Sequence, residues 1–238
     1  MRRAAAGRAR AFRGRRRHDK IEGIPPDHSG GRWNEGEIQE LAELDSPMAI
    51  QEFLNRAAYN PSVMTHSPRW VLHEKKANCF EGALFAAACL RRLGHEPLVV
   101  DLYAVNDDDH VIAVFKDKGW WGAVAKSNFT TLRFREPVYR SLRELVMSYF
   151  DFFYNTLGAK TLRSYSRPLR LTRFDRRNWM TSDENLQYIG DCLNAMKHFT
   201  VVSPQRARVL SPVDPLLFKA GLLSALPAGL FKAKRKKS

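Results

Sequence analysis

NCFEGALFAAACLRRLG, residues 78–94, is the stretch that decides the fold. Most of its residues are apolar or small, and a helix that is apolar all round is buried in the protein. Asn78 is a favourable N-cap, and Gly94 is a natural residue just beyond a helix C-terminus. The stretch therefore predicts a buried helix whose first turn carries Cys79.

Short strand-like runs follow this helix. Residues 97–104 are rich in Leu and Val, residues 110–115 read HVIAVF, and residues 120–126 read WWGAVAK. The composition around residues 116–119 indicates a hairpin turn between the last two runs. A buried helix backed by successive strands predicts an α+β layer architecture in which the cysteine-bearing helix packs on an antiparallel sheet.

The flanking sequence adds further helices and two extensions. Helical spacing of apolar residues predicts extra helices, and residues 162–174 alternate in part, as a strand pair around Pro168 would. The additional helices are expected at residues 34–44, 47–57, 140–157 and 183–199. We divide the chain into a disordered basic tail and linker (1–32), a domain with flanking helices (33–200, core 70–135) and a C-terminal extension with a basic tail (201–238).

The net charge of +14 lies at the two ends of the chain. Residues 1–20 hold nine Lys or Arg and one Asp, and residues 232–238 hold five Lys or Arg, which leaves 25 basic and 24 acidic residues elsewhere. Short blocks of like charge are usually solvated. We expect weak, non-specific and salt-sensitive contact of these tails with nucleic acid or an anionic membrane.

The chain shows neither a disulfide framework nor a membrane span. Its three cysteines are an odd number without a C-x-x-C pair, which favours a reducing compartment. The apolar stretch 216–231 is interrupted by Lys219 and Pro227, so no transmembrane segment is expected. These features predict a cytoplasmic protein.

Cys79 and His110 are the candidates for nucleophilic chemistry. A thiolate is favoured at a helix N-terminus, and an imidazole nearby can hold the proton. We therefore expect Cys79 to be alkylated well below about pH 8, whereas Cys89 and Cys192 react only on unfolding.

The blocks NCFEGALFAAACLRRLG, DDDHVIAVF and GWWGAVAKSN resemble the Cys, His and Asp blocks of the transglutaminase-like superfamily. They are similar to those of a set of bacterial transglutaminase-like proteins, and the resemblance covers roughly residues 70–135. It implies a core shared with papain-like cysteine proteases. It also implies a site in which the cysteine lies at a helix N-terminus, the histidine on a strand, and an Asp or Asn on the next strand.

The third member of the site differs from the family pattern. Ala125 occupies the position where the family has its aspartate, and a count from a turn near residues 117–118 places Ala125 nearest opposite His110. Ser127 shares the strand face of Ala125. Asn128 carries a fixed-direction acceptor, so we expect it to orient His110, with Ser127 as the alternative. The acidic run 107–109 is a further source of a carboxylate.

The predicted function is that of a thiol-dependent acyl-transfer enzyme acting on a peptide or amide substrate, as a hydrolase or a transferase. The predicted catalytic residues are Cys79, His110, Asn128 and Ser127. We expect no cofactor and no metal, because a closed zinc site needs four ligands at tight local spacing. The alternative, which Ala125 favours, is a catalytically degenerate module of the same family that acts in binding or scaffolding.

Overall fold

The computed structural model describes residues 33–234. The tail and linker predicted for 1–32, and residues 235–238, lie outside the described residues. The helices are α1 (Glu35–Ala42), α2 (Pro47–Arg56), α3 (Pro68–Glu74), α4 (Cys79–Arg92), α5 (Leu142–Phe150), α6 (Gln187–Asn194), α7 (Pro204–Ala207) and α8 (Pro215–Gly221), with 3₁₀ turns η1 (Thr130–Leu132), η2 (Leu171–Arg177) and η3 (Pro227–Gly229). The strands are β1 (Ala58–Tyr59), β2 (Lys76–Ala77), β3 (Leu98–Ala104), β4 (His110–Asp117), β5 (Trp120–Val124), β6 (Arg135–Tyr139), β7 (Leu162–Ser166), β8 (Leu169–Arg170) and β9 (His198–Thr200).

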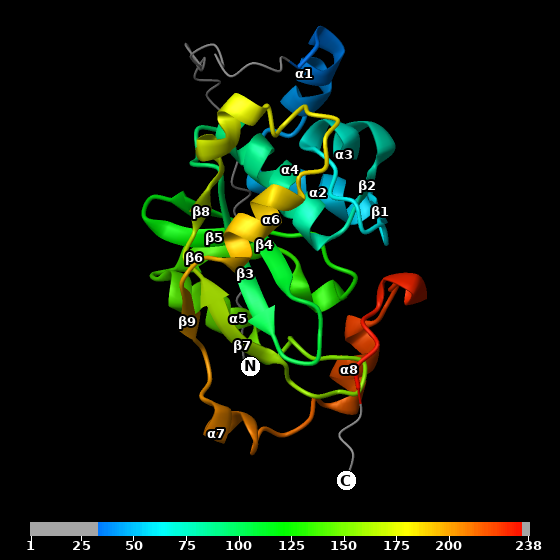
Figure 1. Ribbon diagram of the computed structural model, residues 1–238, viewed down its shortest axis with the longest axis vertical. Helices are drawn as coiled ribbons and strands as arrows, with labels where there is room; N and C mark the ends of the chain where they lie inside the picture. The colour runs from blue at the N-terminus through cyan, green and yellow to red at the C-terminus, as the bar shows by residue number, and fades with distance from the viewer. Residues whose placement is uncertain (1–32, 235–238) are drawn as a thin grey trace, which may run out of the picture.

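A large antiparallel sheet forms the centre of the protein. Its strands lie in the order β6-β5-β4-β3-β7-β9, and β8 also pairs with β3. Alternate residues of β4 point to opposite faces: Val111 and Ala113 pack with α2, α3 and α4, whereas Ile112 and Val114 pack with α5. The fold is thus mixed α+β with helices on both faces of the sheet, and the predicted class is confirmed (Figure 1).

Helix α4 begins at Cys79 because of a capping box. The side chain of Asn78 accepts a hydrogen bond from the Glu81 N–H, and the Glu81 carboxylate accepts one from the Asn78 N–H, both at 2.9 Å. Gly94, with a φ of 86°, follows the C-terminus of the helix. These local signals lie within the sequence itself, which is why the start of the helix agrees with the prediction.

Gly82 allows α4 to approach the end of β5 closely. A Cβ at this position would lie 2.3 Å from the Cβ of Lys126, so no larger residue fits without a shift. Lys126 is buried, and its Nζ donates to the carbonyls of Leu54 (2.8 Å) and Ala57 (2.5 Å) at the end of α2. The approach brings the first turn of α4 next to the segment that follows β5.

The β4–β5 hairpin is tighter than the sequence indicated. Lys118 and Gly119 both have positive φ, as a two-residue type I′ turn requires, and the strands pair from Asp117 with Trp120 onwards. Since Ala113 pairs with Val124, continuing the ladder by three residues would place Ser127 opposite His110. The expectation that Ala125 lies nearest opposite His110 is therefore wrong, because the turn is centred one residue later than counted.

Several other predicted elements differ from the structure. The helix expected over 140–157 ends at Phe150, and the helix expected over 183–199 is shorter and is followed by strand β9. Strands β7 and β8 flank Pro168 but pair with β3 rather than with each other. No helix in the described part of the chain is both long and apolar enough to cross a membrane.

Residues 201–234 of the C-terminal extension pack back onto the sheet domain. The Tyr154 hydroxyl donates to the carbonyl of Leu217 at 2.8 Å, and a Cβ on Gly221 would collide with the same hydroxyl. In Figure 1 this part of the chain, with α8, lies beside the loops at one end of the central strands. The extension thus reaches the part of the molecule that holds Cys79 and His110.

Candidate active site

Cys79 is the first residue of α4 and opens onto a cavity. Its thiol lies 3.8 Å from the carbonyl oxygen of Asp109, to which it donates, and the backbone N–H groups of Val111 and Phe80 donate to the sulfur. The residue is partly exposed. The sulfur therefore lies between the helix N-terminus and the first residues of β4.

The pKa of the Cys79 thiol is raised to about 11, above its ordinary value. Burial is the largest cause, and the negative charge of Asp108 adds to it, while the Val111 and Phe80 N–H groups act in the opposite direction. The expectation of a depressed thiol pKa is wrong for this structure, because desolvation outweighs the field of the helix terminus. Cys79 is a neutral thiol at neutral pH.

His110 is the first residue of β4, and its ring is buried and tightly held. Its Nε2 lies 2.8 Å from the carbonyl oxygen of Leu132, and its ring meets the edges of Tyr149 and Phe153. A carbonyl only accepts, so Nε2 carries the hydrogen and Nδ1 keeps a lone pair. Burial lowers the pKa of His110 to about 4, so the imidazole is neutral at neutral pH.

Asn128 does not orient His110 in this structure, contrary to the prediction. Its amide oxygen accepts from the N–H of Leu226 (2.8 Å), and its amide nitrogen donates to the carbonyl of Leu226 (2.9 Å). The side chain is turned away from the histidine because its hydrogen bonds are used on the C-terminal extension. The Leu132 carbonyl takes the place that Asn128 was expected to fill.

Ser127 does not bond His110 either. Its hydroxyl accepts from the Phe129 N–H at 3.0 Å, which closes the turn that leads into η1. The last residue of η1 is Leu132, whose carbonyl holds the imidazole. Ser127 therefore shapes the loop that presents the carbonyl and acts on His110 only through it.

The acidic run 107–109 lines the cavity, but two of its side chains are engaged elsewhere. The Asp107 carboxylate accepts from the Thr161 hydroxyl at 2.6 Å, and the Asp109 carboxylate accepts from the Ala104 N–H at 2.7 Å. Burial raises the pKa of Asp107 to about 6. In this arrangement it is the backbone of Asp109, not a carboxylate, that contacts the thiol.

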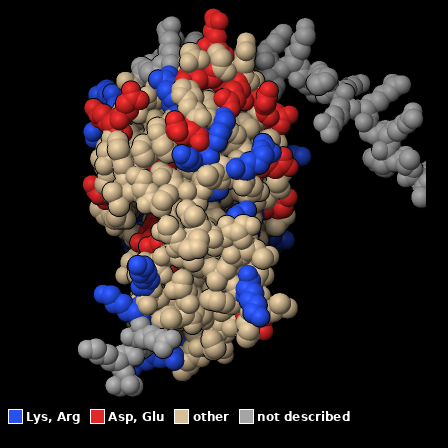
Figure 2. All heavy atoms as spheres, turned by 90° about the vertical axis from the view of Figure 1, so that its right-hand side faces the viewer, with Lys and Arg blue, Asp and Glu red and all other residues tan. Residues whose placement is uncertain are grey.

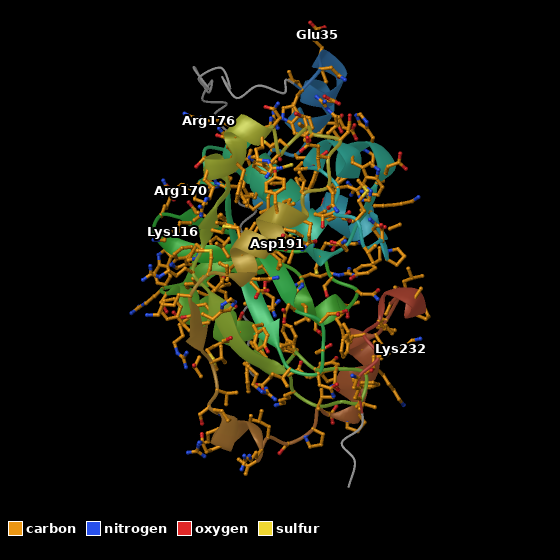
Figure 3. The ribbon with its side chains drawn as sticks, in the orientation of Figure 1. Glu35, Lys116, Arg170, Arg176, Asp191 and Lys232 are labelled. Carbon is orange, nitrogen blue, oxygen red and sulfur yellow. The ribbon has the colours of Figure 1, made fainter. Side chains whose placement is uncertain are left out.

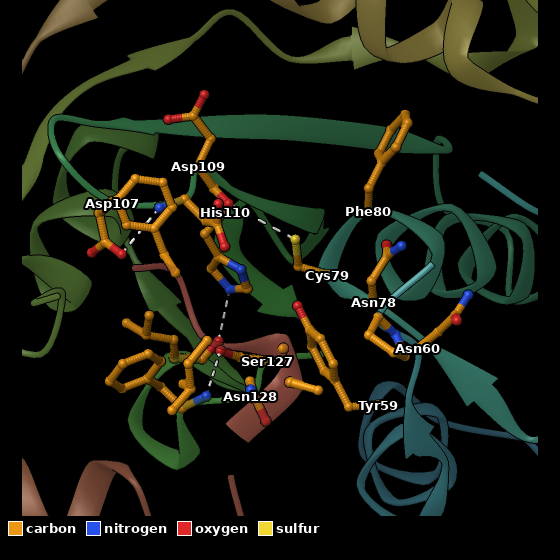
Figure 4. Close-up of a pocket in the computed structure, with 18 of the residues that line it drawn as sticks. Tyr59, Asn60, Asn78, Cys79, Phe80, Asp107, Asp109, His110, Ser127 and Asn128 are labelled. Carbon is orange, nitrogen blue, oxygen red and sulfur yellow. Dashed lines mark hydrogen bonds between the residues drawn. The ribbon is translucent and has the colours of Figure 1, made fainter. Parts of the chain in front are cut away.

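These groups meet in one cavity of about 540 Å³. Its walls include Tyr59, Cys79, the run 107–109, His110, Asn128 and residues 228–231 of the C-terminal extension. Figure 4 shows the thiol of Cys79 and the ring of His110 on one wall, with the hydroxyl of Tyr59 pointing into the space beside them. Burial raises the pKa of Tyr59 far above its usual range, so this hydroxyl stays protonated.

A buried carboxylate lies behind Cys79 in the first turn of α4. Glu81 is fully buried, and besides Asn78 it accepts from the amide of Asn60 (2.9 and 3.0 Å) and from the N–H and ring Nδ1 of His66 (3.0 and 2.6 Å). The His66 ring stacks on Trp70 with centroids 3.9 Å apart. This network anchors the first turn of α4 to the preceding loop and so fixes the position of Cys79.

The other two cysteines lie outside the cavity. Cys89 is buried, and burial raises its pKa beyond the usual range, whereas Cys192 is partly exposed. All three cysteines are free, and no group of His, Cys, Asp and Glu within residues 33–234 has the arrangement of a metal site. A thiol that reacts only on unfolding has to be buried in the folded protein. The partial exposure of Cys192 therefore does not fit the expectation for this residue.

The pH dependence of Cys79 alkylation tests the neutral-thiol state. With a pKa of about 11, the thiolate fraction rises about tenfold per pH unit from pH 7 to 10, whereas an ordinary thiol levels off near pH 9. We expect the iodoacetamide rate at Cys79, followed by peptide mass spectrometry, to keep rising over this range. A rate that levels off below pH 8 would contradict the neutral thiol.

Sequence reasoning missed the Leu132 carbonyl and Tyr59, as well as the C-terminal residues of the cavity wall. A backbone carbonyl leaves no side-chain signal, and the contacts of the extension are made over long sequence separations. The Asn-x-x-Glu capping pattern at residues 78–81 was the one signal that pointed to Glu81.

Neither the comparison with protein-family models nor that with curated proteins found a match to this chain.

Proposed function

We propose that the protein is a thiol-dependent acyl-transfer enzyme built on a transglutaminase-like core. Cys79 is its nucleophile, His110 its proton acceptor, and the Leu132 carbonyl the group that orients His110. The observation that carries the proposal is the shared cavity: a thiol at a helix N-terminus and an imidazole at the start of the adjacent strand, whose Nε2 is held by an acceptor.

The reaction begins from the neutral pair. The Cys79 sulfur attacks the carbonyl carbon of an amide or ester, and the thiol proton passes to Nδ1 of His110. His110 then returns the proton to the departing amine or alcohol as the C–N or C–O bond breaks, which leaves a thioester on Cys79. Water or an amine then attacks the thioester and gives its proton to His110. The C–S bond breaks as His110 passes this proton to the Cys79 sulfur, which releases the acid or the new amide and restores the neutral pair.

The helix terminus supports this reaction in two ways. The N–H groups of the first turn have no partner within the helix, so the N–H of Cys79 can donate to the developing oxyanion. Protonated His110 is stabilised by the Leu132 carbonyl, which accepts from Nε2 throughout the cycle. The group that orients His110 is a backbone carbonyl. The imidazole is therefore held in place even though Ala125 occupies the family's aspartate position.

The alternative is a binding module that holds a peptide without chemistry. Two observations favour it: the cavity wall is partly formed by the chain's own residues 228–231, and burial raises the thiol pKa to about 11. It differs from the first proposal in one outcome, since a binding module forms no thioester.

The experiment that separates the two is a search for an acyl-enzyme. The protein is incubated with a small aryl ester, and its intact mass and the modified peptide are followed with and without an amine acceptor. We expect one acyl group on Cys79, faster release when the amine is present, and no such turnover in Cys79→Ala. Cys192→Ala is the control for the other partly exposed thiol and is expected to behave like wild type.

Acylation confined to Cys192, or an acyl group on Cys79 that is never released, would overturn the proposed enzyme activity and favour the binding module.

The basic tails are a separate matter, because most of their residues lie outside the described part of the chain. On the face that carries the C-terminal extension, Lys and Arg side chains do not merge into a continuous basic surface (Figure 2).

A further inference from the structure

Residues 226–234, which we call the C-terminal segment, are held by side chains that bond to backbone atoms. Asn128 forms a paired donor–acceptor contact with the N–H and carbonyl of Leu226. Asn106 makes the same paired contact with Lys234, at 2.8 Å for both bonds. Between them, the Thr156 hydroxyl donates to the carbonyl of Phe231 at 3.1 Å.

Contacts of this kind recognise the peptide backbone of the segment and not its side chains. A carboxamide that spans the N–H and C=O of one residue imitates the pairing of a β-ladder, so any residue other than proline satisfies it. Asn106 adopts a φ of 58°, which asparagine tolerates better than most residues. These side chains thus bond the segment at both ends and in the middle, and residues 228–231 between the two ends line the Cys79 cavity.

The segment passes directly over Tyr59 at its smallest residue. A Cβ on Gly229 would lie 2.6 Å from two ring carbons of Tyr59 and 3.1 Å from the amide nitrogen of Asn128. The cavity wall on this side consists of residues 228–231. Only a glycine lets the chain lie this close to the tyrosine and the asparagine at once.

We propose that the C-terminal segment occupies a peptide-binding groove of the Cys79 site and keeps that site closed in cis. The groove takes a peptide backbone that makes a tight turn, as η3 does, with glycine beside Tyr59. That such a peptide is a substrate, and not only a ligand, rests on the proposed acyl transfer. In the closed state the tethered segment outcompetes a free peptide, because a short tether gives an effective concentration in the millimolar range.

The proposal also makes the Cys79 thiol a reporter of the closed state. Desolvation is the largest cause of the raised Cys79 pKa, and residues 228–231 of the segment line the same cavity as the thiol. Displacing the segment admits water and lowers the thiol pKa towards its ordinary value. Alkylation of Cys79 therefore reports whether the segment is in place, without any catalytic turnover.

The first test uses Gly229→Leu in the full chain. Its side chain cannot fit against Tyr59, so the segment is pushed out, and at pH 8 we expect iodoacetamide to modify Cys79 at least ~10-fold faster than in wild type as its pKa falls. The matched control is Lys232→Leu, which adds the same side chain on the exposed side of the segment (Figure 3) and should react at the wild-type rate. Asn106→Gly, which tolerates the positive φ but loses both bonds to Lys234, should show a smaller acceleration.

The second test measures binding without chemistry. A fluorescent synthetic peptide with the sequence of residues 224–234, SALPAGLFKAK, is titrated by anisotropy into full chains that carry Cys79→Ala. We expect saturable binding to the Gly229→Leu chain and none at the same concentrations to the chain with its native segment. A peptide with leucine in place of its glycine should not bind.

Unchanged alkylation in both Gly229→Leu and Asn106→Gly would overturn cis closure. Equal binding of the peptide to chains with and without the displaced segment, or no binding to either, would overturn the groove. Failure of the acyl transfer is distinguished by a different result: the peptide binds and alkylation accelerates, yet no thioester forms with the aryl ester even in Gly229→Leu. In that case the groove stands as the peptide site of a binding module.

Discussion

His110→Gln is expected to slow acylation of Cys79 by about 10²- to 10⁴-fold, the usual contribution of a positioned general base. Glutamine has a similar size, and its amide can still donate to the Leu132 carbonyl, so the buried position stays filled and satisfied. What the variant loses is the basic Nδ1 that accepts the thiol proton. The measurement is the single-turnover rate of thioester formation with the aryl ester.

The pH dependence of the acylation rate separates loss of the base in His110→Gln from a general disturbance of the fold. In wild type the acylation rate falls as the pH drops through the His110 pKa of about 4, because imidazolium cannot accept a proton. In the variant this limb disappears, and the rate simply follows the thiolate of Cys79 upwards with pH. The control is His73→Gln, which alters a half-exposed histidine of α3 that pairs with Glu37 of α1, and it should keep the wild-type rate. A His110→Gln rate within about threefold of wild type would remove His110 from the mechanism.

Glu81→Ala is expected to cost about 3–5 kcal/mol of the free energy of unfolding, as the breaking of other buried charged networks does. The carboxylate is fully buried and accepts from Asn60, His66 and Asn78. Alanine leaves these donors inside the protein without an acceptor, which costs more than the bonds themselves. Urea unfolding followed by circular dichroism measures the loss.

The chain provides a matched control for this variant in its first helix. Asn34 and Glu37 form a second capping box at the start of α1, and Glu37 is also buried and ion-paired, with Arg69 and His73. We expect Glu37→Ala to lower stability as well but to leave the alkylation rate of Cys79 unchanged. Glu81→Ala should alter that rate, because its box sets where α4 begins and hence where Cys79 lies. A Glu81→Ala protein within about 1 kcal/mol of wild type would show that the network is not an anchor.

The sequence was most informative where the signal is local. The Asn78 N-cap, the apolar run of α4 and the strand-like run of β4 each depend on neighbours within a few residues, and all three agree with the prediction. The resemblance to the transglutaminase-like superfamily stays a prediction. The hairpin was placed one residue too early, because its turn type depends on the positive φ of Lys118 and Gly119 and not on composition alone.

The sequence by itself therefore determined that Cys79 begins a buried helix and that His110 begins the second of three adjacent antiparallel strands. Only the tertiary structure decided what holds the imidazole, because the acceptor is the backbone carbonyl at the end of η1, 22 residues further on. It also decided the role of Asn128, whose partner Leu226 lies 98 residues away in the sequence. Capping and periodicity act between close neighbours, whereas hydrogen-bond partners and the desolvation that raises the Cys79 pKa depend on which distant segments pack together.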